Sequence, residues 1–246
     1  MKIMTFNIQH GVLHADPEKR IDLKVFAEYI RKENPDILGI NEIRGAADES
    51  LWNGDPNDYN APQAKILAEL TGMNYYFAPA IKSTGNGLYG NALLTKFDIV
   101  SSEKFLIKSP PEEKRLYSRY EDRCLLKATL DSGEENVTVF VCHMGLNPQE
   151  QLAAIETVCF ELDRTEGKKI LMGDFNMTPG DRLLSPIFER MNDTEAYLGE
   201  NIFTFPSDAP NKKIDYIFVS EGFKIKTAIL QEGYISDHKS MIASIE

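Results

Sequence analysis

Short apolar runs alternate with polar or glycine-containing turns along the whole chain. The first run covers residues 3–8 and a second covers residues 37–40. Between them, apolar residues recur at helical spacing from Asp16-Pro17 to Ile30, and Asn34-Pro35-Asp36 ends this segment. The order predicts a β-α-β unit at the beginning of the chain.

The rest of the chain contains more strands than helices. A second helix is predicted over 61–70, and five strand-like runs then follow at 75–80, 92–95, 99–107, 125–130 and 137–142. Consecutive short strands favour antiparallel pairing. The last part of the chain predicts helices over 149–162 and 183–191 and strands over 169–172, 214–219, 223–230 and 241–245. Two packed sheets flanked by helices, an α/β sandwich, account for this mixture.

Composition and charge limit the classes of function that the protein can have. The 246 residues are 42% hydrophobic, which is enough for one domain over 1–246 with a sizeable core. Against 27 basic residues there are 38 acidic ones, a net charge of −11. This charge repels a phosphate backbone, so a broad basic nucleic-acid surface is not favoured. A small cleft that is locally positive or filled by a metal ion remains open.

The cysteines and the amino-terminal segment predict the environment of the protein. Cys124, Cys142 and Cys159 form no CxxC pair, so buried, reduced thiols are expected. The first residues enter a strand pattern without the features of a secretory signal, and no run is long and apolar enough for a bilayer. We therefore expect a cytoplasmic protein with no membrane insertion, and a monomer by default.

The strongest local motif is Gly173-Asp174-Phe175-Asn176, directly after an apolar strand. Because side chains alternate along a strand, Asp174 and Asn176 are predicted to face one cleft while Phe175 turns to the core. The alternative interpretation is an ordinary turn, since Asp, Asn and Gly are common turn residues.

Polar residues also interrupt or end five other apolar runs. They are Asn7, Glu42, His143, Asp215 and the pair Asp237-His238. Carboxylates beside buried strands are costly unless a cation or a donor compensates them, so their convergence implies a metal ion or a paired histidine. Oxygen ligands suit Mg²⁺, with Mn²⁺ as the alternative, and the absence of a cysteine pattern argues against structural zinc.

In this set of motifs the sequence resembles the endonuclease/exonuclease/phosphatase superfamily, the group that contains deoxyribonuclease I. The resemblance rests on TFNI at 5–8, NPDILGINEI at 34–43, GNALLTKFDI at 90–99, EDRCLLKATL at 121–130, VFVCHMGL at 139–146, GDFNMTPGD at 173–181, KIDYIFVS at 213–220 and SDHKSMIASI at 236–245. Each motif is weak alone, but their order and spacing are specific.

The resemblance implies a four-layer α/β sandwich of two mixed, mostly antiparallel sheets, with the site at the sheet mouth. It implies a metal-dependent phosphoric ester hydrolase that uses Mg²⁺ or Mn²⁺. The residues matched to metal binding are Asn7, Glu42 and Asp237, and those matched to catalysis are His143, Asp174, Asn176, Asp215 and His238. In these roles Asp174 and Asn176 orient water and a phosphoryl oxygen, His143 and His238 contact phosphoryl oxygens, and Asp215 holds the His238 ring.

Four further residues are weaker substrate-binding candidates. Arg123 either reaches a phosphate or, as we favour, ties a carboxylate in place. Asn91 either touches the phosphate or caps a turn. Trp52 in the 44–60 loop and Arg119 in the basic, aromatic 109–122 loop can grip a substrate, or the loops can simply pack on the body or lie in solvent.

The sequence favours a phosphodiesterase or phosphatase that acts on a small or single-stranded phosphoester. The alternative is a DNA or RNA nuclease, which the net charge and the lack of basic inserts disfavour. A non-catalytic binding module on the same fold is a third hypothesis, disfavoured because every position of the motif set is present. The substrate itself is left open, since one fold hosts many activities.

Overall fold

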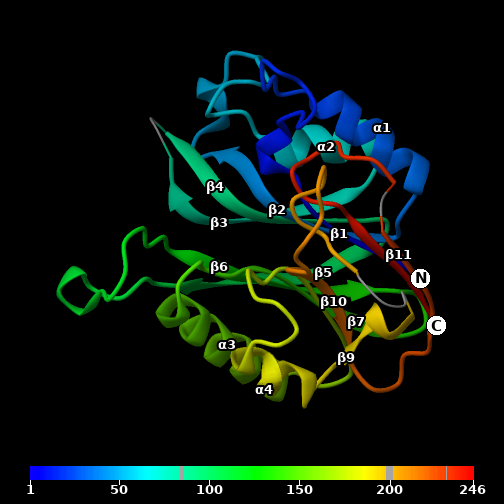
Figure 1. The fold of residues 1–246 in the computed structure, drawn as a ribbon. Coiled ribbons are helices and arrows are strands. Elements are labelled where there is room, and N and C mark those ends of the chain that lie inside the picture. The colour runs from blue at the N-terminus through cyan, green and yellow to red at the C-terminus, as the bar shows by residue number, and fades with distance from the viewer. Residues whose placement is uncertain (84–85, 198–201, 231) are drawn as a thin grey trace.

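The computed structural model describes residues 1–83, 86–197, 202–230 and 232–246. Within these residues, two six-stranded sheets lie face to face and helices cover their outer faces (Figure 1). The first sheet has the order β11 (Ile225–Leu230), β12 (Met241–Ile245), β1 (Lys2–Asn7), β2 (Ile37–Ala46), β4 (Gly87–Thr95), β3 (Asn74–Lys82). The second has the order β5 (Asp98–Ile107), β6 (Arg123–Asp131), β7 (Asn136–His143), β8 (Lys168–Asp174), β10 (Asp215–Val219), β9 (Asn192–Asp193).

Each sheet carries its own pair of helices. They are α1 (Leu23–Glu33) and α2 (Gln63–Thr71) on the first sheet, and α3 (Pro148–Asp163) and α4 (Ser185–Phe188) on the second. Short 3₁₀ helices lie at η1 (Gln9–Gly11), η2 (Glu49–Leu51), η3 (Glu112–Lys114), η4 (Arg182–Leu184) and η5 (Thr194–Tyr197). The layers are therefore helix, sheet, sheet, helix, and the predicted four-layer α/β sandwich is confirmed.

Three apolar clusters fill the spaces between these layers. One lies between the sheets and includes Met172 and Ile217, one lies under α3 and α4, and one lies under α1 and α2. The central strands are almost continuously buried, and because successive side chains point to opposite faces, they supply apolar groups to both faces of each sheet. Burial of this apolar surface is the main force that holds the two halves together.

The predicted elements agree with the structure except at some boundaries. Helix α1 begins later than expected, because the Asp22 side chain caps it by accepting a hydrogen bond from the Lys24 N–H, while Asp16 instead stabilises a turn. Strand β2 continues to Ala46, beyond the predicted end. The helix predicted over 183–191 is shared between η4 and α4. Strand β9 carries no sequence signal, since it is only two residues long.

Strand direction collects the polar strand ends at one edge of the sandwich. Strand β1 runs parallel to β2, and β7 runs parallel to β8, while β8 and β10 are antiparallel. Asn7, His143 and Asp174 consequently end their strands at the same edge. Asp215 begins β10 directly opposite Asp174. Sheet topology thus brings together residues that lie far apart in the sequence.

The cysteines are free, as expected, but their burial differs. Cys124 and Cys142 are buried, whereas Cys159 on α3 is only half-buried. In the part of the chain that the structure describes, no helix has the length and apolar character required to span a bilayer.

Candidate active site

A cleft of about 870 Å³ opens at the edge where the strand ends meet. On one side it is lined by His10, Glu42, Arg44 and Tyr89, which we call the first wall. On the other side it is lined by Arg123, His143, Asp174 and Asn176, which we call the second wall. Phe205, Asp237 and His238 come from the chain before β12 and complete the cleft.

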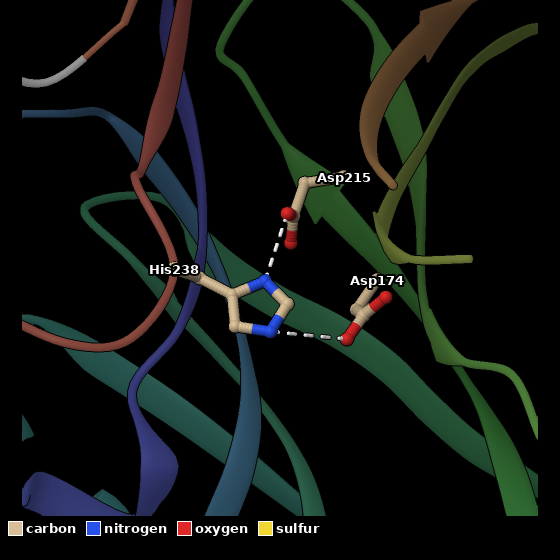
Figure 2. A group of neighbouring side chains, drawn as sticks. All are labelled: Asp174, Asp215 and His238. Carbon is tan, nitrogen blue, oxygen red and sulfur yellow. Dashed lines mark hydrogen bonds and ion pairs between the residues drawn. The ribbon is translucent and has the colours of Figure 1, made fainter. Parts of the chain in front are cut away.

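His238 lies between two carboxylates (Figure 2). Its Nδ1 is 2.9 Å from Asp215 Oδ2, and its Nε2 is 3.6 Å from Asp174 Oδ2. All three side chains are buried. The aromatic ring of Phe205 packs against the imidazole, with the ring centroids 4.8 Å apart. The Asp215 contact orients the ring so that Nε2 faces Asp174 and the cleft.

Burial and charge act in opposite directions on these groups. Burial alone lowers the pKa of His238, but the adjacent Asp215 and Asp174 carboxylates raise it to about 10. Burial raises the pKa of Asp174, and the charge of His238 opposes this effect. At neutral pH His238 is therefore a cation, and Asp174 is a stronger base than an exposed aspartate.

His143 and Arg123 lie on the far side of Asp174. His143 Nε2 is 3.6 Å from Asp174 Oδ2, and its Nδ1 is 3.5 Å from Arg123 Nη1. Burial, together with the charges of Arg123 and His238, holds the pKa of His143 well below its ordinary value. Arg123 also forms an ion pair of 2.9 Å with Glu121 while lining the cleft. The preferred interpretation of Arg123, a side chain tied to a carboxylate, matches this geometry.

Glu42 owes its direction to a bulge in β2. Register shifts between Ile40 and Ile43, and Glu42 has a φ of +57°, in the left-handed region that is unfavourable for a glutamate. Its two oxygens accept hydrogen bonds from Asn7 Nδ2 at 3.1 Å and from the Tyr89 hydroxyl at 2.6 Å. Backbone strain of this kind is concentrated at functional sites.

Asn7 connects the two walls rather than offering its oxygen to the cleft. Its Nδ2 donates to Glu42 Oε1 and to Asp174 Oδ2, both at 3.1 Å, while its Oδ1 accepts a hydrogen bond from the Gln9 N–H. The role of Asn7 as an oxygen ligand of a metal ion stays a prediction, and in the structure its amide nitrogen faces the two carboxylates. The side chain here aligns two carboxylates.

The donor set of the cleft fits a divalent cation at Glu42 and Asp237. Among the described residues Glu42 has no cationic partner, and only neutral groups hydrogen-bond to it. Burial raises the pKa of Asp237, and the charge of Glu42 raises it further, a repulsion that a cation would relieve. Asp174, Asp215 and His238 form a tighter cluster, within 4.8 Å. In that cluster the two ring nitrogens of His238 already face the Asp215 and Asp174 carboxylates.

Asn176 lies in the cleft as predicted, although not by strand alternation. Strand β8 ends at Asp174, and Asn176 has a φ of +51°. Its N–H donates to Asp174 Oδ1 and its Nδ2 donates to the Met144 carbonyl, both at 2.9 Å. Phe175 is fully buried, as expected. The turn thus holds Asp174 in place and leaves the Asn176 amide oxygen for a ligand.

Asn91 lies outside the cleft, in contrast to its proposed phosphate contact. It is only 2% exposed and lies between the sheets. Its Nδ2 donates to the Cys124 carbonyl and its Oδ1 accepts from Asn41 Nδ2, both at 2.9 Å. Asn41 also donates to the Cys142 carbonyl and accepts from the Asp174 N–H. These two buried amides join the sheets and fix the backbone at Asp174.

Trp52 and Arg119 do not line the cleft either. The Trp52 indole donates to the Asp55 carbonyl within its own loop, so the ring helps to order that loop. Arg119 is exposed, and its carbonyl accepts a hydrogen bond from Asn147 at the start of α3. The structure therefore supports the packing and solvent alternatives for these two residues.

Sequence reasoning missed several residues that line the cleft, among them His10, Arg44, Tyr89 and Phe205. Arg44 carries a detectable signal, because it lies two positions after Glu42 on a strand, where side chains share a face. Tyr89 is opposite Arg44 in the β2–β4 register, which only the structure reveals. His10 lies in the short 3₁₀ helix η1 and Phe205 forms an isolated β-bridge, so neither has a periodic signal.

The chain matches a known protein family in sequence and solved structures in fold. The model of the endonuclease/exonuclease/phosphatase family matches residues 4–238. An endonuclease/exonuclease/phosphatase family protein from Leptotrichia buccalis has 21% identity and a TM-score of 0.75, with 100% of this chain and 99% of that chain covered. None of the curated proteins compared matches the chain.

Two further solved structures, a phosphatase and the Nocturnin catalytic domain, have the same fold as this chain. A mannosyl-6-phosphatase from Bacteroides thetaiotaomicron has 18% identity and a TM-score of 0.73, covering 100% of this chain and 99% of that chain. The human Nocturnin catalytic domain with a bound sulfate anion has 19% identity and a TM-score of 0.71, covering 100% and 93%. At these identities the likeness establishes the fold.

Proposed function

This chain belongs to the endonuclease/exonuclease/phosphatase family, whose members hydrolyse phosphoester bonds, and from that premise we propose a divalent-metal-dependent phosphodiesterase or phosphatase. Its substrate is a small or single-stranded phosphoester, and the reaction is in-line attack of water on phosphorus. The observation that carries the proposal is the buried chain Asp215–His238–Asp174, with separations of 2.9 and 3.6 Å, at the floor of the cleft.

Asp174 is the residue we assign to the attacking water. Its raised pKa makes it a better proton acceptor than an exposed aspartate, and three groups aim at its Oδ2: Asn7, His143 and His238. The Asn176 N–H fixes its other oxygen. A fixed carboxylate with an elevated pKa suits general-base catalysis, because its proton affinity is matched to neutral pH.

His238 and His143 are the groups we assign to the phosphoryl oxygens. His238 is a cation because of Asp215 and donates a charge-assisted hydrogen bond to the developing negative charge. His143 stays neutral because its pKa is held low, so it donates one hydrogen bond without adding charge. The Asn176 amide oxygen faces the same region and can orient the water.

Glu42 and Asp237 are the residues we assign to Mg²⁺, with Mn²⁺ as the alternative. When bound, the ion neutralises charge on the phosphoryl and leaving oxygens. The protein contributes by holding Glu42 in its strained conformation through Asn7 and Tyr89. Because these two donors are neutral, the full carboxylate charge remains for the cation.

A small or single-stranded substrate agrees with the charge distribution. The net charge of −11 opposes the approach of a long polyanion. Within the cleft the cations are Arg44, Arg123, Lys212 and the protonated His238, too few to follow both strands of a duplex. The mannosyl-6-phosphatase among the structural neighbours supports a small phosphate ester, whereas the nuclease alternative has no comparable support in the cleft.

The test is a hydrolysis screen of the purified protein with Mg²⁺, with Mn²⁺ and with chelator. The panel contains p-nitrophenyl phosphate, bis-p-nitrophenyl phosphate, sugar phosphates, mononucleotides, single-stranded oligonucleotides and duplex DNA. We expect metal-dependent hydrolysis of small esters that Glu42→Gln largely abolishes and that the exposed-strand control Glu103→Gln retains. Preferential cleavage of duplex DNA would favour the nuclease instead, and no hydrolysis of any ester would refute the proposal.

A further inference from the structure

Arg44 on the first wall is a cation with little exposed surface. It is 8% exposed, yet none of the described carboxylates forms an ion pair with it. Its Nη1 has one long hydrogen bond, 3.4 Å to the Asn57 carbonyl, and its guanidinium lies 4.4 Å from the centroid of the Tyr59 ring. Most of its five donors are thus left without a partner in the protein.

Burial of an unpaired cation has an energetic cost. Desolvation lowers the pKa of Arg44, and the nearby Tyr59, Tyr89 and Asp58 only partly oppose this. A guanidinium that lacks a carboxylate but stacks on an aromatic ring is arranged to receive an anion from outside. Because Arg44 lines the cleft, that anion can come from a bound substrate.

The position of Arg44 is set by rigid neighbours. The Arg44 N–H donates to Gln63 Oε1 at 3.0 Å, and Gln63 Nε2 donates to the His10 carbonyl at 2.8 Å. Gln63 is fully buried at the start of α2. Across the sheet, Arg44 is in register with Tyr89, whose hydroxyl bonds Glu42. The guanidinium is therefore held at a defined place beside Glu42.

The other cations of the cleft differ from Arg44. Arg123 on the second wall is paired with Glu121 at 2.9 Å, and Lys212 is exposed. His10 beside Arg44 is neutral at pH 7, because burial and the charge of Arg44 lower its pKa to about 4. The positive charge at this end of the cleft is thus the single guanidinium of Arg44.

We propose that Arg44, stacked on Tyr59, is a second anion-binding subsite of the cleft that takes a phosphate or carboxylate group of the substrate other than the scissile phosphate. The inference rests on the proposed function, because it assigns the scissile phosphate to the Asp174 and Glu42 region. It narrows the substrate class to phosphoesters that carry two anionic groups. Arg44 accordingly determines specificity and does not act on the reacting atoms.

The kinetic test uses substrate pairs that differ only in the second anion. One pair is thymidine 5′-(p-nitrophenyl phosphate) with and without a 3′-phosphate, and the other is α-glucose 1,6-bisphosphate and glucose 6-phosphate. A charge-assisted hydrogen bond of this kind is worth about 10- to 100-fold in kcat/KM. We expect the wild-type protein to prefer the doubly anionic member by this factor in at least one of the two substrate pairs. Arg44→Gln should remove this preference, because kcat/KM falls more for the doubly anionic member than for the singly anionic one.

Two variants serve as controls. Arg44→Lys retains the charge without the planar fork, so an intermediate preference is expected. Arg31→Gln removes an arginine outside the cleft that also donates one hydrogen bond to a carbonyl, that of Leu70, and should leave the preference unchanged. Equal rates within both pairs, or a preference that survives Arg44→Gln, would overturn the inference while hydrolysis itself still supported the proposed function.

A binding measurement separates the two proposals if turnover is absent. Calorimetric titration of the metal-free protein with thymidine 3′,5′-bisphosphate and with thymidine 5′-monophosphate compares the affinities directly. We expect tighter binding of the bisphosphate that Arg44→Gln abolishes and Arg31→Gln retains. Equal affinities would refute the subsite. Discrimination without hydrolysis of any ester would refute the proposed function and retain Arg44 as an anion site.

Discussion

The two walls of the cleft compensate their charges in different ways. On the second wall opposite charges are paired, because Asp174 faces the protonated His238 and Arg123 is bound to Glu121, while His143 beside Asp174 is neutral. On the first wall the partners are neutral. Glu42 is bound by an amide and a hydroxyl, and Arg44 by a carbonyl and an aromatic ring.

This difference separates groups that tune one another from groups that are left for ligands. A paired charge changes the pKa of its neighbour, which is how Asp215 raises the pKa of His238. A charged side chain whose hydrogen-bond partners are all neutral is not compensated, so it still attracts a ligand of opposite charge. Glu42 can therefore attract a cation, and Arg44 an anion, only two positions apart on β2.

Asp174→Asn should break the charge pairing of the second wall. Loss of a general base typically reduces a rate by about 10²- to 10⁴-fold, and we expect a loss of about 10³-fold in kcat for phosphoester hydrolysis with Mg²⁺. Steady-state kinetics on the best ester of the screen measures it. Asp163→Asn, an exposed aspartate paired with Arg190, is the control. A loss below about tenfold would remove Asp174 from the chemistry.

Asn41→Ala should weaken the connection between the sheets. The truncation leaves the Asp174 N–H and the Cys142 carbonyl without their buried partners, which costs about 1–3 kcal/mol for each unsatisfied group. We expect the free energy of unfolding to fall by about 3 kcal/mol in urea denaturation. The exposed Asn136→Ala should change it by less than about 0.5 kcal/mol. Equal effects of the two changes would contradict the bridging role.

Tyr89→Phe tests whether neutral donors prepare Glu42 for a cation. Removal of a group that hydrogen-bonds a metal ligand typically weakens metal binding by about 10- to 100-fold, and we expect about tenfold for Mn²⁺. Titration calorimetry with Mn²⁺ measures the affinity. Tyr75→Phe, on the exposed part of β3, should leave it unchanged. An unchanged affinity in Tyr89→Phe would move the cation away from Glu42.

His10→Asn should give the smallest effect, which depends on pH. The pKa of His10 is lowered to about 4, below the value of 6.5 expected in the unfolded chain. Between these values the unfolded state binds a proton that the folded state excludes. The wild type therefore loses stability as pH falls from 6.5 to 4, and the loss is complete only below 4.

Asparagine tolerates the left-handed φ of +47° at position 10, so the variant should fold. The melting temperature, measured from pH 8 to pH 4, should fall less steeply for His10→Asn than for the wild type. Parallel curves would show that His10 is not the group that titrates in this interval.

Several strong features were predictable because they depend on near neighbours in the sequence. The strand and helix periods, the turn before β2 and the polar residues at strand ends follow from local sterics and burial. The GDFN turn placed Asp174 and Asn176 correctly in the cleft, although left-handed backbone rather than strand alternation directs Asn176. The local sequence pattern thus predicted which polar residues lie at the site.

The tertiary structure decided which side chains each polar residue of the site contacts. Asn91 has the same local signature as a site residue, yet the packing of the two sheets turns it inward to Asn41. The bulge in β2 aims Glu42 at the cleft, and strand register brings Tyr89 beside it. Arg44 differs from a paired arginine only through contacts with residues of the 44–60 loop. Such contacts join residues distant in the sequence, so local periodicity does not contain them.

By itself, therefore, the sequence determined the two-sheet sandwich, the acidic and histidine-containing strand ends and the family that they resemble. Only the tertiary structure decided which charges are paired and which are left for ligands. The reason is physical: the order of apolar and polar residues sets which side of each element is buried, whereas the field at a carboxylate or guanidinium depends on every group that folding brings within a few ångströms of it.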